Sequence, residues 1–240
     1  MIINDIKYDK DKIAGMIDQT LLAPDATEKM IIDLCATVKR FKFRSACTNS
    51  FWAPLVAREL KGTGIESCFV VGFPFGAIST SSKVFEASET LKSLNGAPAA
   101  IDMVTNIGLL KDKNYKAYTK DIAAVVNAGE SSSGGIKAIL ETALLTEDEI
   151  KAACECATEA GVKFVKTSTG RGGAPLIKDV IIMRQTCPEN IGVKFSGYGN
   201  CNPLQLAIMG IAAGANRLGS PIGPSIIEEM DRYYEKLTVR

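Results

Sequence analysis

Two short stretches of the chain, KFVKTST (163–169) and GVKFSG (192–197), decide its fold class. Each is a run of mostly apolar and β-branched residues with the length of one strand. The residues between them carry apolar side chains at helical spacing, with Gly and Pro near both ends. A strand, a helix and a second strand in this order predict two parallel strands with a helix packed across them.

The same alternation extends over the whole chain. The predicted strands are residues 16–20, 45–49, 67–73, 100–106, 136–142, 163–169, 192–197 and 216–220. Eight such units in 240 residues predict a single (β/α)8 TIM barrel. An open doubly wound sheet is the alternative, but no GxGxxG follows the first strand and even spacing favours closure. We expect one domain over residues 1–240, with residues 1–12 as a short N-terminal extension.

Three of the predicted helices have a start signal in the sequence. Asp25 with Glu28, and Thr146 with Glu149, have the spacing of a capping box. Asn202 precedes Pro203, which suits a cap followed by Pro at the first helical position.

Composition excludes several classes of protein. The chain is 46% hydrophobic and 23% charged, with a formal net charge of +1, so no overall field attracts it to nucleic acid or anionic lipid. The N-terminus has no apolar core typical of a signal peptide, and no apolar run approaches the ~20 residues that span a membrane. We expect a cytoplasmic protein.

Histidine is absent, which removes Ser-His-Asp and Cys-His triads and the usual His-ligated zinc sites. The seven cysteines are scattered and odd in number, which indicates reduced thiols. One residue separates Cys154 from Cys156, whereas two separate the cysteines of a zinc knuckle, and the chain has no second closely spaced pair of cysteines. We therefore expect no metal and no cofactor, with acid–base chemistry left to Asp, Glu, Lys, Tyr or Cys.

Three predicted strands each contain a charge: Asp102, Lys166 and Lys194. Strands covered on both faces are normally apolar throughout. Because the apolar neighbours of these residues point toward the helices, the charged side chains should point into the barrel. A structural ion pair or lysines that extend to solvent would explain one such residue, but three together are harder to dismiss.

Two lysines and a carboxylate in one pocket suit amine catalysis. Neighbouring ammonium groups lower each other's pKa from about 10.4 toward about 7–8, where a neutral amine becomes available. A neutral lysine attacks carbonyls and forms a Schiff base, and a nearby carboxylate moves the protons.

Seven motifs, in order, resemble the deoxyribose-phosphate aldolase family. They are IDQTLL (17–22), ACTN (46–49), GFPFG (72–76), IDMV (101–104), ILET (139–142), FVKTSTG (164–170) and GVK (192–194). The resemblance extends from about residue 13 to residue 229, and FVKTSTG is its most specific part.

The resemblance implies a class I aldolase that reversibly cleaves 2-deoxy-D-ribose 5-phosphate to acetaldehyde and D-glyceraldehyde 3-phosphate. It assigns the Schiff base to Lys166, the second lysine to Lys194 and proton transfer to Asp102, with Asp18 in support. It also places residues at the substrate: Cys47, Thr169, Gly170, Arg171, Gly197, Gly219 and Ser220. The expected partner is a small aldehyde or sugar phosphate, with a homodimer or homotetramer as the assembly.

The chain departs from the family pattern where the family binds phosphate through backbone N–H groups. Tyr198 stands where a second glycine is usual, and Pro221 and Ile222 replace a Ser-Ser step. Proline has no N–H to donate, and tyrosine adds bulk where a backbone should approach closely. Two interpretations remain open. Either Ser220, Ile222 and Gly223 still bind phosphate with help from Arg171, or the substrate lacks phosphate or carries a different distal group.

Other functions remain as alternatives: a Schiff-base lyase or isomerase on the same barrel, and a non-catalytic sugar-binding protein. A non-catalytic sugar-binding protein would leave the inward charges without a role. The reactivity of Cys47 and the direction of flux are not given by the sequence.

Overall fold

In the computed structural model, which describes residues 1–197, 199 and 202–238, eight parallel strands close into a barrel. They are β3 (Ile17–Leu21), β4 (Ser45–Asn49), β5 (Glu66–Val71), β6 (Ala99–Val104), β7 (Gly135–Ile139), β8 (Phe164–Lys166), β9 (Gly192–Ser196) and β10 (Arg217–Ser220). Consecutive strands are neighbours, and β10 pairs with β3 to close the ring. The predicted (β/α)8 barrel is confirmed.

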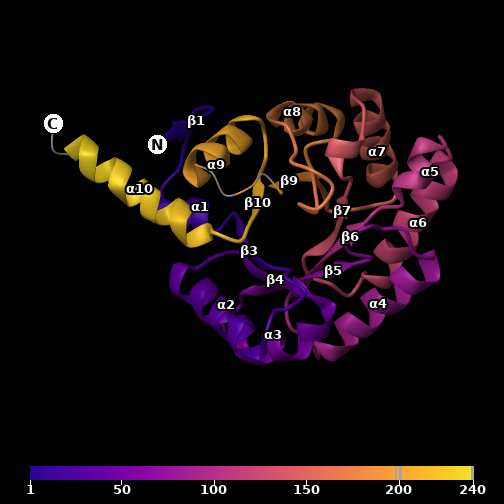
Figure 1. Cartoon of the computed structure of the whole chain (residues 1–240), viewed down its shortest axis with the longest axis horizontal. Coiled ribbons are helices and arrows are strands. Elements are labelled where there is room, and N and C mark those ends of the chain that lie inside the picture. Colours follow the sequence, from indigo (N-terminus) through magenta and orange to yellow (C-terminus); the bar gives the residue numbers. More distant parts are fainter. Residues whose placement is uncertain (198, 200–201, 239–240) are drawn as a thin grey trace.

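Helices surround the strands in chain order, as Figure 1 shows from one end of the barrel. They are α2 (Glu28–Phe41), α3 (Ala53–Glu59), α4 (Thr80–Ser93), α5 (Ile107–Lys111), α6 (Tyr115–Ala128), α7 (Glu147–Glu159), α8 (Ile177–Thr186), α9 (Pro203–Ala212) and α10 (Gly223–Thr238). Two 3-10 turns, η1 (Ser50–Trp52) and η2 (Thr142–Leu144), follow β4 and β7. Among the described residues, no helix combines the length and apolar character needed to cross a membrane.

The N-terminal segment forms a small antiparallel hairpin of β1 (Ile2–Ile3) and β2 (Ile6–Lys7). The Asn4 side chain donates to the Ala212 carbonyl at 3.0 Å, which ties the hairpin to the end of α9. Helix α1 (Lys10–Ala14) follows and contacts α10. A helix therefore begins inside the segment that we expected to be an extension.

Strand boundaries agree with the predictions within two residues except at the ends of β7 and β8. Each ends three residues earlier than predicted, at Ile139 and Lys166. Backbone hydrogen bonds between the two segments nevertheless continue past both strand ends. The Leu140 N–H donates to the Lys166 carbonyl at 2.9 Å, and the Thr142 N–H donates to the Thr167 carbonyl at 3.0 Å.

One of the three predicted helix starts is confirmed and one is wrong. Thr146 and Glu149 form the expected capping box of α7. At α2 the N-cap is Thr27, not Asp25, because the chain still turns at residues 24–26 before the helix begins. Asn202 is the N-cap residue of α9 but forms no side-chain cap bond.

The apolar core lies between the barrel and the helices. Along β6, Ile101 and Met103 belong to this layer, whereas Asp102 between them does not. Side chains alternate along a strand, so Asp102 faces the barrel interior. The interior of this barrel contains ionic groups alongside a small apolar group of Cys47, Cys68 and Val70.

Candidate active site

Strand register brings charges from four strands together inside the barrel. Lys166 on β8 lies directly opposite Lys194 on β9. Asp102 on β6 lies opposite Lys137 on β7. All four are buried, with 4% exposure for Lys166 and none for the others.

Asp102 is the central acceptor of this cluster. Its Oδ2 accepts from the Nζ of Lys166 and from the Nζ of Lys194, both at 2.8 Å. Its Oδ1 lies 3.1 Å from the Nζ of Lys137 and accepts from the Cys68 thiol at 3.2 Å. One carboxylate therefore contacts three lysines.

Asp18 on β3 contacts the cluster from the other side. Its Oδ2 lies 2.5 Å from Lys194 Nζ. Its Oδ1 accepts from the Arg217 guanidinium at 2.9 Å and from the Ser45 hydroxyl at 2.7 Å. Lys194 is therefore held between two carboxylates.

Glu66 extends the ionic network to the start of the strands. Its Oε1 lies 3.5 Å from Arg217 and 3.8 Å from Lys137. Its Oε2 lies 3.4 Å from the half-exposed Arg44. We call Asp18, Glu66, Asp102, Lys137, Lys166, Lys194 and Arg217 the interior cluster.

Burial and charge act in opposite directions on the pKa values of this cluster. Burial raises the pKa of Asp102, but Lys137, Lys166 and Lys194 outweigh it and hold the pKa well below its ordinary value. Asp18 follows the same pattern, since Lys194 and Arg217 outweigh burial and lower its pKa. Both carboxyl groups are therefore ionised at neutral pH.

The pKa of Lys194 differs from the sequence-based expectation. Burial lowers it, but the carboxylates of Asp102 and Asp18 dominate, and the net pKa lies well above the ordinary lysine value. The pKa of Lys137 is raised for the same reason, by Asp102 against burial. The expectation of mutual lowering placed Asp102 and Asp18 near the lysines but did not weigh their charges against the repulsion between the lysines. Lys194 stays an ammonium ion.

Cys47 and Cys68 form a buried thiol pair beside this cluster. They lie opposite each other on β4 and β5, and both are free. The hydrogen bond between them lowers the pKa of Cys47 and raises that of Cys68, and burial raises both. Their sulfurs and an Asp102 oxygen are close enough to bind one metal ion. Because the ammonium groups of Lys137 and Lys194 already contact Asp102, a further cation is disfavoured there.

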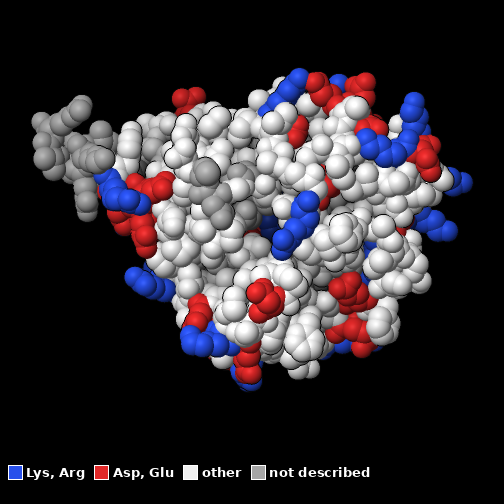
Figure 2. All heavy atoms as spheres, in the orientation of Figure 1, with Lys and Arg blue, Asp and Glu red and all other residues white. Residues whose placement is uncertain are grey.

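A pocket of about 340 Å³ opens above the cluster at the carboxyl ends of the strands. It is lined by Thr20, Leu21, Leu22, Ala23, Phe73, Lys166, Thr169, Gly170, Arg171, Ser196, Gly197, Gly199, Gly219 and Pro221. In Figure 2, charged residues lie mainly around the edge of this face and surround a hollow near its centre. Of the interior cluster, only Lys166 lines the pocket among the described residues.

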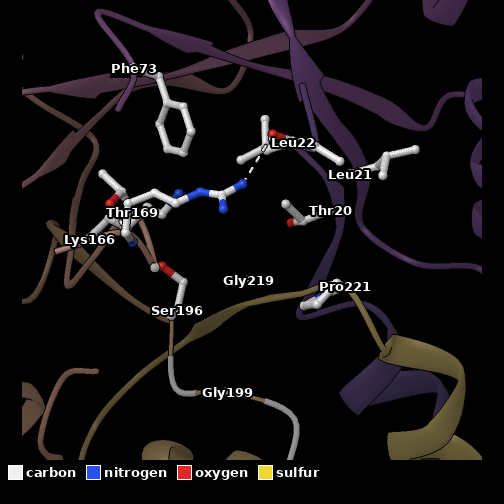
Figure 3. Close-up of a pocket in the computed structure, with 14 residues that line it drawn as sticks. Thr20, Leu21, Leu22, Phe73, Lys166, Thr169, Ser196, Gly199, Gly219 and Pro221 are labelled. Atoms are coloured by element: carbon white, nitrogen blue, oxygen red, sulfur yellow. Dashed lines mark hydrogen bonds between the residues drawn. The ribbon is translucent and has the colours of Figure 1, made fainter. Parts of the chain in front are cut away.

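The lining residues come from opposite sides of the barrel. In Figure 3, Lys166, Thr169 and Phe73 lie on one side and Thr20 and Pro221 on the other. The Arg171 guanidinium donates to the Leu22 carbonyl at 3.5 Å. Lys166 and Arg171 are the charged residues of the described lining.

The expected substrate contacts fall into two groups. Thr169, Gly170, Arg171, Gly197 and Gly219 line the pocket. Cys47 lies beneath it in the barrel interior, and Ser220 is buried and does not line it.

The loop after β10 uses its own polar groups internally. Ile222 N–H donates to the Ser220 hydroxyl at 3.2 Å, and Gly223 N–H donates to Gln19 Oε1 at 2.9 Å. Gln19 in turn donates to the Pro221 carbonyl at 2.8 Å. Two of the three N–H groups that we considered for phosphate therefore already have partners. The other departure from the family pattern, Tyr198, lies outside the described residues.

Sequence reasoning missed Glu66, Lys137 and Arg217. Lys137 lay within a predicted strand between Ile136 and Ala138, so the same alternation that identified Asp102 would have found it. Glu66 and Arg217 are the first residues of their strands, where a charge commonly reaches solvent and gives no signal.

Comparison with known proteins identifies the family. No family model matches the chain. A deoxyribose-phosphate aldolase from Clostridium tetani is 45% identical over 220 residues, which cover 91% of this chain and 99% of the relative. One from Halalkalibacterium halodurans is 46% identical over 217 residues, covering 90% and 94%. The tetrameric deoxyribose phosphate aldolase structure from Aeropyrum pernix is 26% identical, covers 93% of this chain and is itself covered to 92%, with a TM-score of 0.84.

The barrel, the relatives and the family motifs agree with one another. The relatives are covered almost completely, so the similarity is not confined to a shared fragment. The chain belongs to the deoxyribose-phosphate aldolase family of carbon–carbon lyases.

Proposed function

We propose that the chain reversibly cleaves 2-deoxy-D-ribose 5-phosphate to acetaldehyde and D-glyceraldehyde 3-phosphate through a Schiff base on Lys166. The observation that carries this proposal is the position of Lys166. It lines the pocket, while Asp102 contacts it from the buried side and also contacts Lys194. A substrate carbonyl in the pocket would meet one amine and no other member of the interior cluster.

Charge and position set Lys166 apart from the other basic groups of the interior cluster. The interior cluster contains three carboxylates and four basic groups, so the basic groups outnumber the carboxylates by one. Arg217 cannot lose its proton, and raised pKa values keep Lys137 and Lys194 charged. Lys166 is the remaining basic group and the one that lines the pocket.

The reaction then follows amine chemistry. Neutral Lys166 adds to the C1 carbonyl, and loss of water gives an imine that accepts the electrons of the breaking C2–C3 bond. The C3 hydroxyl proton is removed as D-glyceraldehyde 3-phosphate leaves. Protonation of the remaining enamine and hydrolysis release acetaldehyde and regenerate Lys166.

Asp102 and Lys194 would serve the proton transfers. Asp102 Oδ2 touches both lysines at 2.8 Å, so it can accept a proton from one and return it. The lasting positive charge of Lys194 stabilises the Asp102 carboxylate, and Asp18 holds Lys194 in place. No protein-bound cofactor is required for these steps.

The distal phosphate would meet Arg171, Gly197 and Gly219, which line the same pocket. A guanidinium and backbone N–H groups are typical phosphate ligands. One observation favours a second candidate, an aldolase for a substrate without phosphate. The N–H groups of Ile222 and Gly223 already have internal partners.

We propose a homodimer or homotetramer as the assembly, and the Aeropyrum pernix relative is described as a tetramer. A small aldehyde or sugar phosphate is the proposed partner.

The test is acetaldehyde release from 2-deoxyribose 5-phosphate and from 2-deoxyribose, with Lys166→Met as the blank. We expect the phosphate ester to be cleaved faster, and borohydride with acetaldehyde to leave an N-ethyl group on Lys166. Equal rates for the two sugars would favour the second candidate. Absence of the adduct from Lys166 would reject the mechanism.

A further inference from the structure

Glu141 adopts a backbone conformation that is unusual for its residue type. It lies between β7 and η2 with φ 59° and ψ 59°, in the left-handed region, and is 3% exposed. A side chain with a Cβ is strained there, and such strain persists where surrounding contacts hold it, often at functional sites.

Its carboxylate is held by the segment after Lys166. Both oxygens lie 3.3 Å from the Thr169 N–H, and Oε2 accepts from the Thr169 hydroxyl. Within the part of the chain that the structure describes, no Lys or Arg forms an ion pair with Glu141. The charge is thus stabilised by hydrogen bonds from one residue of the pocket wall.

The loop also fits closely around this carboxylate. A Cβ added to Gly172 would lie 2.9 Å from both Cγ and Cδ of Glu141, too close for any other residue type without a shift. The 169–172 segment therefore wraps around the Glu141 side chain.

The hydrogen bonds have a fixed direction. An ionised carboxylate only accepts, so the Thr169 hydroxyl proton must point to Glu141. The same Thr169 oxygen accepts from the Arg171 N–H at 3.0 Å. Glu141 thereby orients Thr169, and Thr169 orients the backbone at Arg171.

The Arg171 side chain is weakly held by the part of the chain that the structure describes. It is exposed, and its guanidinium makes one long bond to these residues, 3.5 Å, to the Leu22 carbonyl. We infer that Glu141 is a positioning residue that sets the preference for a phosphorylated substrate, by holding the Thr169–Arg171 turn so that the Arg171 guanidinium meets the distal phosphate. This inference rests on the proposed function.

The experiment measures kcat/KM for 2-deoxyribose 5-phosphate and for 2-deoxyribose, and takes their ratio. The variants are Glu141→Gln, Arg171→Ala and the double variant. We expect Glu141→Gln to lower the ratio about 10-fold, mainly through KM for the phosphate ester. In the Arg171→Ala background it should lower the ratio no further, because both changes remove the same interaction.

Two further variants separate positioning from folding. Glu141→Gly removes the carboxylate but suits the left-handed backbone, so it should fold and lose the same preference. Asp179→Asn is the matched control. Asp179 is a neighbouring buried carboxylate that accepts from the Thr142 hydroxyl and the Leu176 N–H, and it has no contact with the Thr169–Arg171 turn. It should leave the ratio unchanged.

Borohydride trapping of acetaldehyde on Lys166 provides a readout that the inference predicts to be unaffected, since acetaldehyde does not reach Arg171. Equal losses for both sugars in the Glu141 variants, or multiplicative effects with Arg171→Ala, would overturn the inference. A wild-type protein that releases no acetaldehyde would instead reject the proposed function.

Discussion

The interior cluster and the mouth of the pocket differ in how their polar groups are held. In the barrel, Asp102 contacts three lysines and Lys194 contacts two carboxylates, all on strands and almost fully buried. At the mouth, Arg171 is exposed, and among the described residues its guanidinium makes one long hydrogen bond. The amine chemistry thus depends on strand register, whereas substrate preference depends on loop contacts, so the two are separable by mutation.

The largest effect should come from Lys166→Met. Loss of the nucleophilic amine should lower cleavage of 2-deoxyribose 5-phosphate by roughly 10³-fold or more. Stability should change little, because Lys166 contacts one carboxylate, Asp102, which keeps its contacts with Lys137 and Lys194. Activity assays and denaturant unfolding check the two parts. A strongly destabilised Lys166→Met protein would show that Lys137 and Lys194 do not suffice as counter-charges for Asp102.

Lys194→Met is the matched comparison inside the same cluster. It removes the cation between Asp18 and Asp102, so we expect a loss of about 3–5 kcal/mol in the free energy of unfolding, the usual cost of breaking a buried ion pair. Activity should fall by about 10²–10⁴-fold, since proton transfer is also impaired. Urea unfolding of both lysine variants measures the contrast, and equal stabilities would refute it.

At the mouth, Arg171→Ala should affect binding more than chemistry. Loss of a charged hydrogen bond to phosphate costs about 1.5–3 kcal/mol, so KM for the phosphate ester should rise by about 10- to 100-fold. The kinetics of 2-deoxyribose should be nearly unchanged. A proportional loss with both sugars would show that mouth and interior are not separable.

The smallest effect concerns pH. The pKa of Asp18 is lowered in the folded protein, so its stabilisation is complete above the ordinary value of 3.8 and is lost as pH falls through the lowered value. The pKa of Lys194 is raised, so its stabilisation is complete below 10.5 and is lost as pH rises through the raised value. From about pH 5 to 9 Asp18 and Lys194 should therefore add no slope to stability.

Thermal melting of the wild type and of Asp18→Asn tests this window. The difference between their melting temperatures should stay constant from about pH 5 to 9 and shrink below about pH 4. A difference that changes steadily between pH 6 and 8 would mean that another group of the cluster titrates there.

Much of this arrangement was predictable because strand periodicity is a local property. Asp102, Lys166 and Lys194 each stand between apolar residues, and alternation alone indicates that they face inward. The pKa of Lys194 was not predictable in this way, since Asp18 lies 176 positions away in the chain and reaches it only through closure of the barrel. The hydrogen bond from the Gly223 N–H to Gln19 also depends on closure of the barrel, because Gln19 lies on β3 and Gly223 follows β10.

The sharing of Asp102 Oδ2 between Lys166 and Lys194 has a consequence for laboratory evolution of this barrel. Any single exchange at Asp102, Lys194 or Asp18 leaves a neighbour without its counter-charge, so epistasis among these sites should be strong and positive: exchanging both partners should cost less than the sum of the single exchanges. Accepted substitutions for new aldehyde acceptors are expected to accumulate around Arg171 and Pro221 instead. The reaction would thus be inherited unchanged while the range of substrates diversifies.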